Sequence, residues 1–340
     1  MTARKRFLDT LNFKKPGDRL PMVEWAPWWS KTTDRWKTEG LPDNLNNEEI
    51  QEYFGLDPMI CVHAIGTVGM PQPAYHGGPV VLDMDSYNAL RPGLFLDEMI
   101  DAVISRVRKI KPKHDRGEII VRLWLDGFFW FPRKMLGIES HMYGFYDQPD
   151  LIHKMNRDLT EFNLRVIKKL FPVLKPDMVG FAEDMSYNNG PMLSEDMFNE
   201  FLLPYYQQVI PAIKINGGKV LCDSDGDITH LLPWMRRAGI EGVYPLERQA
   251  GVDLVRLRRE YPDFLFMGGY DKMVMSLGME TMRAEFERLL PAMRTGGYIL
   301  SVDHQTPPGV SLEQYRNYLS LLQEYSEKAV IVHESMKQVN

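Results

Sequence analysis

The sequence is poor in cysteine, in long apolar runs and in clustered basic residues. Two cysteines among 340 residues make a disulfide framework unlikely and fit a reducing compartment. No apolar run approaches the ~20 residues that a membrane helix requires, and MTARKRFLDTLNF reads as an amphipathic helix rather than a signal peptide. Acidic and basic side chains are mixed, with net charge −6, which gives little support for nucleic-acid binding. We therefore expect a soluble, cytoplasmic protein that binds neither membranes nor nucleic acid.

Several ligand-binding motifs are also missing. No GxGxxG follows an expected strand, and no GxxxxGK[ST] loop is present, so nucleotide-binding folds lose support. The segment LCDSDGD (221–227) carries three aspartates around a glycine, as calcium loops do. An EF-hand loop, however, needs glycine at its sixth position and glutamate at its twelfth. Counted from Asp223, the glycine is fourth and the twelfth residue is Trp234, which excludes that motif.

From about residue 118 the chain alternates short apolar runs with longer amphipathic patterns. The runs predict strands and the amphipathic patterns predict helices. Repeated strand–helix units imply parallel strands with right-handed crossovers. Eight units at this length predict a closed (β/α)8 TIM barrel, as a single domain spanning 1–340 with an N-terminal helical extension. The expected strands lie at 19–25, within 56–84, and at 118–125, 177–183, 218–224, 241–247, 263–269 and 298–303.

Acidic residues recur at the carboxyl ends of these expected strands. In a barrel enzyme those ends form one rim, which carries the active site. Acidic side chains are poor strand residues, so their recurrence at one topological position indicates function. Crowded carboxylates tend to raise a pKa or to bind a cation, although a helix N-cap, such as Asp227, is the alternative. The candidates are Glu24, Asp126, Glu183, Asp184, Asp223, Asp225, Glu247, Asp271 and Asp303.

Two further features point to the same rim. His304 is the histidine that we place directly after a strand, and we expect it on the rim. Aromatic residues crowd into EWAPWW (24–29) and LWLDGFFWF (123–131). Core packing is one explanation, and a pocket for a flat apolar ligand is the other. The candidate pocket residues are Trp25, Trp28, Trp29, Trp124, Phe128, Phe129 and Trp130.

Six segments of the chain together are typical of one superfamily: RKRFLDTLNFKKPGDRLPMVEW, YFGLD, EDMSYNNGPMLSEDMFNEFLLPYYQQVI, GGKVLCDSDGDI, GGYDKM and GGYILSVDHQTPPGVSLEQYRNYL. In these segments the chain resembles the uroporphyrinogen decarboxylase superfamily, a group of barrels that includes the decarboxylase and cobalamin-dependent methyltransferases. The resemblance covers nearly the whole chain. In the decarboxylases an RQAGR stretch follows the first strand and binds the carboxylates of the porphyrinogen, whereas this chain has EWAPWWSKTTDR, which disfavours that activity.

Zinc-dependent methyltransferases of this superfamily carry a His-x-Cys-Gly motif after the fifth strand and a late cysteine after the eighth. Aligned on Gly226, these positions hold Asp223 and Asp225, and the late cysteine aligns with His304. The resemblance therefore implies a harder site that could hold Zn²⁺ or another divalent ion. The metal-free alternative is a general acid drawn from Asp223, Asp225, Glu183 and His304, beside Asp184.

We interpret the chain as a corrinoid-dependent methyltransferase that demethylates aryl methyl ethers. The cobalamin would belong to a separate corrinoid protein, because the chain lacks an Asp-x-His-x-x-Gly motif. One alternative is decarboxylation of a porphyrinogen-like or smaller acid, and another is a non-catalytic barrel that binds a corrinoid or porphyrin. The exact substrate, the metal and a homodimer stay open. Substrate contacts are expected from Glu24, Trp25, Trp28, Trp29, Asp126, Phe128, Tyr187, Asn188 and Glu247.

Overall fold

The computed structural model describes residues 1–331, which form two compact units. Unit 1 comprises Met1–Ile60, Arg116–Ile120 and the chain from Val243 on, and unit 2 comprises Cys61–Asp115 and Val121–Gly242. Each unit is built of parallel strands alternating with helices, as the barrel prediction requires. The prediction of one domain over 1–340 stays a prediction.

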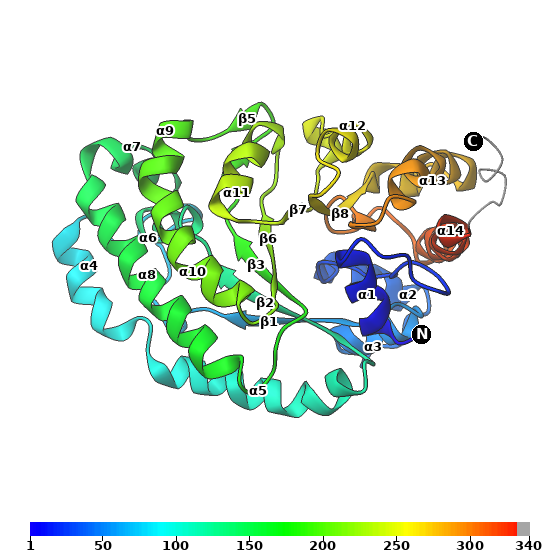
Figure 1. Ribbon diagram of the computed structural model, residues 1–340, viewed down its shortest axis with the longest axis horizontal. Coiled ribbons are helices and arrows are strands. Elements are labelled where there is room, and N and C mark those ends of the chain that lie inside the picture. The colour runs from blue at the N-terminus through cyan, green and yellow to red at the C-terminus, as the bar shows by residue number, and fades with distance from the viewer. Residues whose placement is uncertain (332–340) are drawn as a thin grey trace. The chain divides into compact units, whose positions relative to one another are not determined.

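Unit 2 holds strands β1 to β6 and the helices between them (Figure 1). β1, β2, β3 and β6 follow one another in its parallel sheet, and α8 and α10 pack side by side. The strands are β1 (Met59–Ala64), β2 (Ile120–Asp126), β3 (Met178–Ala182), β4 (Ser186–Tyr187), β5 (Gly190–Pro191) and β6 (Lys219–Asp223). The helices are α4 (Met84–Leu90), η1 (Arg91–Gly93), α5 (Asp97–Asp115), α6 (Trp130–Leu136), α7 (Ile138–Asp147), α8 (Pro149–Leu170), α9 (Glu195–Met197), η2 (Phe198–Leu202), α10 (Leu203–Lys214), η3 (Thr229–Leu231) and α11 (Leu232–Ala238).

Unit 1 holds the N-terminal helices and the last βα repeats. β7, β8 and β9 are neighbours in its part of the sheet, and α13 packs against α14. The strands are β7 (Gly242–Tyr244), β8 (Leu265–Tyr270) and β9 (Tyr298–Val302). The helices are α1 (Ala3–Leu11), α2 (Ser30–Thr38), α3 (Asn47–Tyr53), η4 (Arg248–Ala250), α12 (Leu254–Glu260), η5 (Lys272–Ser276), α13 (Met279–Met293) and α14 (Leu312–Val330).

The pleat of the strands in unit 2 separates two kinds of side chain. Successive residues of a strand point to opposite faces. Phe181 and Cys222 pair across β3 and β6 and are fully buried, with Phe181 packed edge-on against Tyr206 of α10 at 5.4 Å. This face therefore packs against the helices, and burying each large apolar side chain contributes roughly 1.5–3 kcal/mol. The other face carries Arg122 and Trp124 of β2.

One close approach shapes the strands of unit 1. β8 pairs in parallel with β9, and Gly268 of β8 has a positive φ of +105°. A Cβ built there would lie 2.0 Å from the carbonyl oxygen of Pro245, so only glycine fits. The Tyr298 hydroxyl donates to the carbonyl of Gly268 at 2.8 Å, which fastens the two strands at this point.

The structure confirms seven of the eight predicted strands and corrects the first. The segment 19–25 forms no strand, although Val23 and Glu24 are buried there. Pro21 lacks an N–H donor, and the backbone N–H of Met22 donates to the Asp57 side chain instead of to a ladder. The strand expected within 56–84 is β1.

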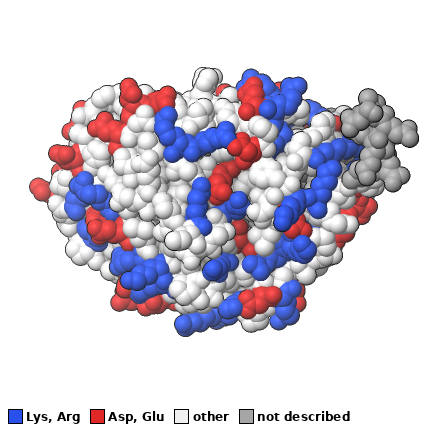
Figure 2. All heavy atoms as spheres, viewed as in Figure 1, with Lys and Arg blue, Asp and Glu red and all other residues white. Residues whose placement is uncertain are grey.

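Two surface properties bear on the predicted partners. Within residues 1–331 no helix is both long and apolar enough to cross a membrane. On the face drawn in Figure 2, basic and acidic side chains are interspersed rather than gathered into one basic surface.

Candidate functional site

The carboxylates predicted after β3 and β6 lie beside one another in unit 2. Ala182 pairs with Asp223, so the residues that follow β3 meet the end of β6. The backbone N–H groups of Glu183 and Asp184 both donate to the carbonyl oxygen of Asp223, at 2.9 and 3.3 Å. Asp184 has a left-handed φ of +43°, a conformation that aspartate tolerates better than most residues. The parallel register thus brings the predicted pairs into one cluster.

Asp223 is the carboxyl of this cluster best suited to holding a proton. Its residue exposure is only 7%. Burial raises its pKa well above the usual range, the carboxylates of Asp184 and Asp225 raise it further, and the charge of Arg122 opposes them. Burial and the neighbouring carboxylates favour the protonated form of Asp223, and a protonated carboxyl can donate a proton to a leaving oxygen.

The loop after β6 is held in place by a tight backbone contact. Gly226 has a φ of +80°, and a Cβ there would lie 2.8 Å from the backbone N, C and O of Tyr187. The N–H of Asp227 donates to the Tyr187 carbonyl at 2.9 Å, and the Ser186 hydroxyl donates to the Asp227 carbonyl. The glycine of LCDSDGD therefore fixes the aspartates against the β4–β5 hairpin. The Tyr187 side chain is 61% exposed and Asn188 is exposed, so both are open to a ligand.

Glu183 has a different setting from its neighbour Asp184. It is fully buried, and its carboxylate accepts from the backbone N–H groups of Phe128, Phe129 and Trp130 at 2.7, 2.7 and 3.0 Å. The Tyr206 hydroxyl donates to it as well. These hydrogen bonds organise the turn between β2 and α6, while burial raises the Glu183 pKa to about 7 against them. The predicted role of Glu183 as a general acid stays a prediction.

Asp126 ends β2 with a buried carboxylate. It accepts from the Lys134 ammonium group at 3.1 and 3.3 Å, and the same ammonium donates to the hydroxyl of Thr67. The Asp126 carboxylate, which was predicted on the rim, is therefore paired with Lys134 within unit 2.

A thiol–imidazole–guanidinium group that was not predicted from sequence lies on β1 and β2: Cys61, His63 and Arg122. Arg122 is 2% exposed, and its guanidinium carbon lies 5.1 Å from the Trp124 ring, whose centroid is 5.4 Å from that of His63. Burial raises the pKa of Cys61, but the charge of Arg122 and hydrogen bonds with His63 and Arg122 outweigh it and lower the pKa to about 7. Residues two apart on a strand share a face, so the spacings Cys-x-His (61–63) on β1 and Arg-x-Trp (122–124) on β2 could have revealed this group from the sequence. Cys222 is fully buried, and burial raises its pKa well above the usual range.

In unit 1 the predicted His304 lies among aromatic side chains. Its ring centroid is 5.9 Å from that of Trp25 and 6.2 Å from that of Trp29. The Trp25 indole donates to the carbonyl of Val302 at 3.0 Å, while Trp29 is 43% exposed. Side-chain ligand atoms of His304 and Glu247 lie within 4.8 Å of each other, so two oxygen and nitrogen ligands suitable for a divalent ion stand together.

The strand-end carboxylates near this histidine are held by Lys272. Its ammonium group lies 3.9 Å from the Glu247 carboxylate and 3.6 Å from that of Asp303. Asp303 also accepts from the backbone N–H groups of Arg248 and Lys272 at 3.0 and 3.1 Å. Burial raises the Asp303 pKa, and the Lys272 charge opposes that effect.

Several residues that were predicted to contact the substrate lie in the packed interiors of the two units. Glu24 accepts from the hydroxyls of Tyr315 and Ser301 at 2.8 and 3.0 Å and is buried. Trp28 packs edge-on against the rings of Trp36, Phe54 and Tyr315. In unit 2, Phe128 is fully buried against Phe181, Tyr205 and Tyr206, and Phe129 packs on His141 and Phe145. This burial favours packing roles for these aromatic residues.

The predicted metal ligands divide between the units. Asp223 and Asp225 belong to unit 2, and His304 belongs to unit 1. Carboxylate and imidazole donors fit Zn²⁺ or a harder divalent ion, and no thiolate is needed. The three-ligand set remains a prediction.

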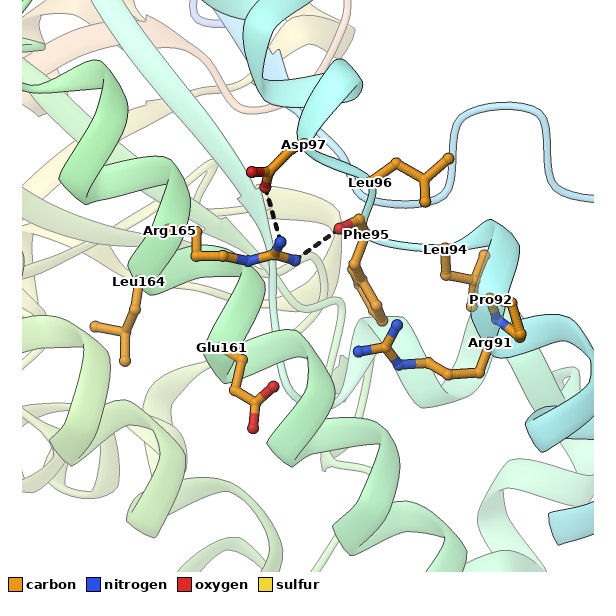
Figure 3. A pocket seen from close by; sticks show the side chains of 9 residues that line it. All are labelled: Arg91, Pro92, Leu94, Phe95, Leu96, Asp97, Glu161, Leu164 and Arg165. Atoms are coloured by element: carbon orange, nitrogen blue, oxygen red, sulfur yellow. Dashed lines mark hydrogen bonds and ion pairs between the residues drawn. The ribbon is translucent and has the colours of Figure 1, made fainter.

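Figure 3 shows a cavity of about 680 Å³ in unit 2. Its lining comes from the connection between α4 and α5 and from α8, and both of its arginines are paired, Arg91 with Asp158 and Arg165 with Asp97. Arg165 donates to Asp97 at 2.7 Å and to the Phe95 carbonyl at 2.6 Å, as the dashed lines mark. Another cavity of unit 2 lies beside α6.

Comparisons with known proteins identify the fold. A methyltransferase from Methanosarcina mazei matches at 15% identity and a TM-score of 0.66, covering 96% of this chain and 99% of the other. A Listeria monocytogenes structure assigned as a vitamin-B12 independent methionine synthase matches at 11% identity and a TM-score of 0.46, over 91% and 97% of the two chains. None of the curated proteins compared matches the sequence.

At 15% identity, the likeness to the Methanosarcina mazei structure establishes a shared TIM-barrel-like α/β fold, as predicted. The family assignment rests on the sequence itself. The model of the uroporphyrinogen decarboxylase (URO-D) family matches residues 79–325, which is more than half of the chain. The matched residues include the Asp223 cluster, strand β2 with Arg122, and His304. The chain therefore belongs to the uroporphyrinogen decarboxylase family.

Proposed function

We propose that this chain is a methyltransferase that removes the methyl group of an aryl methyl ether, with Asp223 as the general acid. The observation that carries the proposal is the buried Asp223 carboxyl at the end of β6, whose pKa is raised by burial and by the neighbouring Asp184 and Asp225. An aryl ether leaves as a phenolate, and a proton delivered to its oxygen lowers the barrier to cleavage. The family and the fold, which a methyltransferase shares, support the proposal.

The remaining residues of the reaction divide into proton handling and substrate positioning. A reduced corrinoid on a partner protein would supply the nucleophile that accepts the methyl group. The Asp223 carboxyl gives its proton to the ether oxygen, so the products are a phenol and the methylated acceptor. Asp184 and Asp225 favour the protonated form of Asp223 through their charge. The exposed Tyr187 and Asn188 flank this loop and are positioned to orient the substrate.

The test measures conversion of 4-methoxybenzoate to the phenol in the presence of chemically reduced cobalamin. Asp223→Asn keeps the shape of the side chain but removes the acid, and we expect turnover to fall roughly 10²–10⁴-fold. Asp227→Asn on the same loop is the matched control, because asparagine can also accept from the Thr229 N–H, and it should retain activity. Full activity in Asp223→Asn would refute the acid role. Elemental analysis of the purified protein tests the predicted divalent metal.

Decarboxylation is the second candidate, favoured by the buried Arg122. A guanidinium on the inner face of β2 is suited to a substrate carboxylate. Release of carbon dioxide from an aromatic or porphyrinogen-like acid without any corrinoid would favour this candidate. Phenol formation that depends on reduced corrinoid would favour methyl transfer.

A further inference from the structure

A small pocket opens in unit 2 beside the segments that follow β1 and β2. Its volume is about 260 Å³, below the ~300–1,000 Å³ typical of sites for drug-sized ligands, so it suits a ligand with one ring. The lining residues follow the carboxyl ends of β1 and β2, and barrel enzymes in general carry their active sites at this end of their strands. It is lined by Met70, Gln72, Pro73, His76, Gly77, Gly78, Trp130, Arg133, Lys134, Gly137 and Ile138.

The pocket walls are fixed by main-chain contacts. The N–H of Ile138 donates to the Gly77 carbonyl at 2.9 Å, and the N–H groups of Val80 and Val81 donate to the Met135 carbonyl at 2.8 and 3.0 Å. Gly137 has a φ of +77°, and a Cβ there would lie 2.7 Å from the Gly77 carbonyl oxygen. The loop and the helix start therefore lock together around glycine, which preforms the site and lowers the ordering cost of binding.

The chemistry of the lining is cationic and aromatic. Arg133 and Lys134 contribute positive charge, and none of the lining residues is acidic, although the whole chain carries −6. Lys134 is paired with Asp126, whereas Arg133 forms no ion pair with any residue in 1–331. The Arg133 guanidinium lies 5.4 Å from the Trp130 ring and donates to the carbonyl of Asp184 at 3.0 Å.

A buried histidine near Arg133 supports this view of the local charge. Both ring nitrogens of His141 are buried without a hydrogen-bond partner. Burial, and then the charge of Arg133, lower the His141 pKa to about 3, so this ring stays neutral and adds no positive charge. The excess charge of the pocket therefore rests on Arg133.

We propose that this pocket binds a small aromatic carboxylate, with its ring against Trp130 and its carboxylate on Arg133. Arginine matches a carboxylate in two parallel hydrogen bonds, and aromatic rings offer flat apolar surface. Through Asp184 the pocket adjoins the Asp223 cluster, because Arg133 bonds to Asp184, whose N–H bonds to Asp223. Taking the bound acid as the substrate rests on the proposed function and narrows its class to methoxylated aromatic acids.

Binding is tested without any corrinoid, by titrating the full chain calorimetrically with 4-methoxybenzoate and with neutral 4-methoxybenzyl alcohol. We expect the acid to bind at least about tenfold more tightly than the alcohol, since a hydrogen-bonded charge pair is worth more than a neutral contact. Arg133→Gln should remove that preference and Arg133→Lys should restore part of it. Equal binding of acid and alcohol to the natural chain would overturn the proposal.

A second variant guards against misfolding of the arginine variants. Gln72→Glu adds a negative charge to an exposed lining residue, so it should weaken the acid about tenfold and leave the alcohol unchanged. Lys168→Gln on α8 removes a charge elsewhere and should alter neither ligand. If Gln72→Glu leaves the acid unaffected, the pocket is not its site. Binding with no methyl transfer would refute the proposed function alone, and methyl transfer with no binding preference would refute this inference alone.

Discussion

The buried Glu24 predicts a specific pH dependence of stability. Burial raises the pKa of this carboxyl to about 7 from its usual 4.5, while hydrogen bonds from Tyr315 and Ser301 oppose the shift. In the unfolded chain the same group releases its proton near the usual value. Between these two pKa values the folded protein binds more protons than the unfolded chain, so stability falls as pH rises through this range.

The magnitude follows from the two pKa values. Each pKa unit corresponds to 1.36 kcal/mol, so a pKa rise from 4.5 to about 7 costs the folded state about 3 kcal/mol at pH 8 relative to pH 4. Glu24→Gln cannot titrate and should lack this term. The difference in unfolding free energy between the natural chain and Glu24→Gln should therefore shift by about 3 kcal/mol between pH 4.5 and pH 8, in favour of the variant at the higher pH.

Urea denaturation at pH 4.5, 5.5, 6.5 and 8 measures the effect, with Glu139→Gln as the control because that glutamate is exposed on α7. The control should shift no more than surface substitutions do, within about 0.5 kcal/mol. A difference that stays constant with pH, or that favours the natural chain at pH 8, would mean that Glu24 is ionised in the fold and would refute the reasoning.

Two more predictions concern single groups. Iodoacetamide should alkylate Cys61 with a half-maximal rate near pH 7 and leave Cys222 unmodified in the folded protein, and peptide mass spectrometry would locate the adduct. His63→Ala should move that profile to higher pH, whereas an unchanged profile would contradict the contribution of His63. Gly226→Ala should cost more than about 2 kcal/mol in urea unfolding, because its φ is left-handed and its Cβ meets the Tyr187 backbone. A loss below about 0.5 kcal/mol would contradict that contact.

The βα repeats could be predicted from sequence because their strands are continuous apolar runs. Ile120–Asp126 and Met178–Ala182 are buried on both faces, as strands of parallel sheets are. The segment 19–25 has similar apolar content but no ladder, since Pro21 lacks a donor and Asp57 takes the Met22 N–H. The hydropathy of a segment does not show which hydrogen-bond partners its backbone groups have. The segment 19–25 could therefore not be distinguished from a strand by its sequence.

The acidic cluster was predictable for a topological reason, and its polar surroundings were not. Parallel register alone brings the residue after β3 to the end of β6, which joins Asp184 to Asp223. Whether a carboxylate then faces a ligand or the interior depends on side-chain parity. Glu183 follows the parity of the buried Phe181 and bonds to three backbone N–H groups, and Arg122 follows the opposite parity. A shift of one residue in the pairing register of β2 or β3 would have turned Glu183 and Arg122 to the opposite faces of the sheet.

The resemblance to zinc-dependent methyltransferases implies that Asp223 and Asp225 occupy the positions of a His-x-Cys motif, and the proposed chemistry at the end of β6 differs accordingly. A cysteine thiolate bound to zinc cannot donate a proton, whereas a carboxyl whose pKa is raised by burial can. The two aspartates differ in setting, since Asp223 is buried and Asp225 is half-buried after the strand. Burial and the negative charge of Asp225 both raise the pKa of Asp223 and so favour its protonated form. The contact of Gly226 with the Tyr187 backbone fixes the loop, so the proposed acid Asp223 would be in place before any substrate binds.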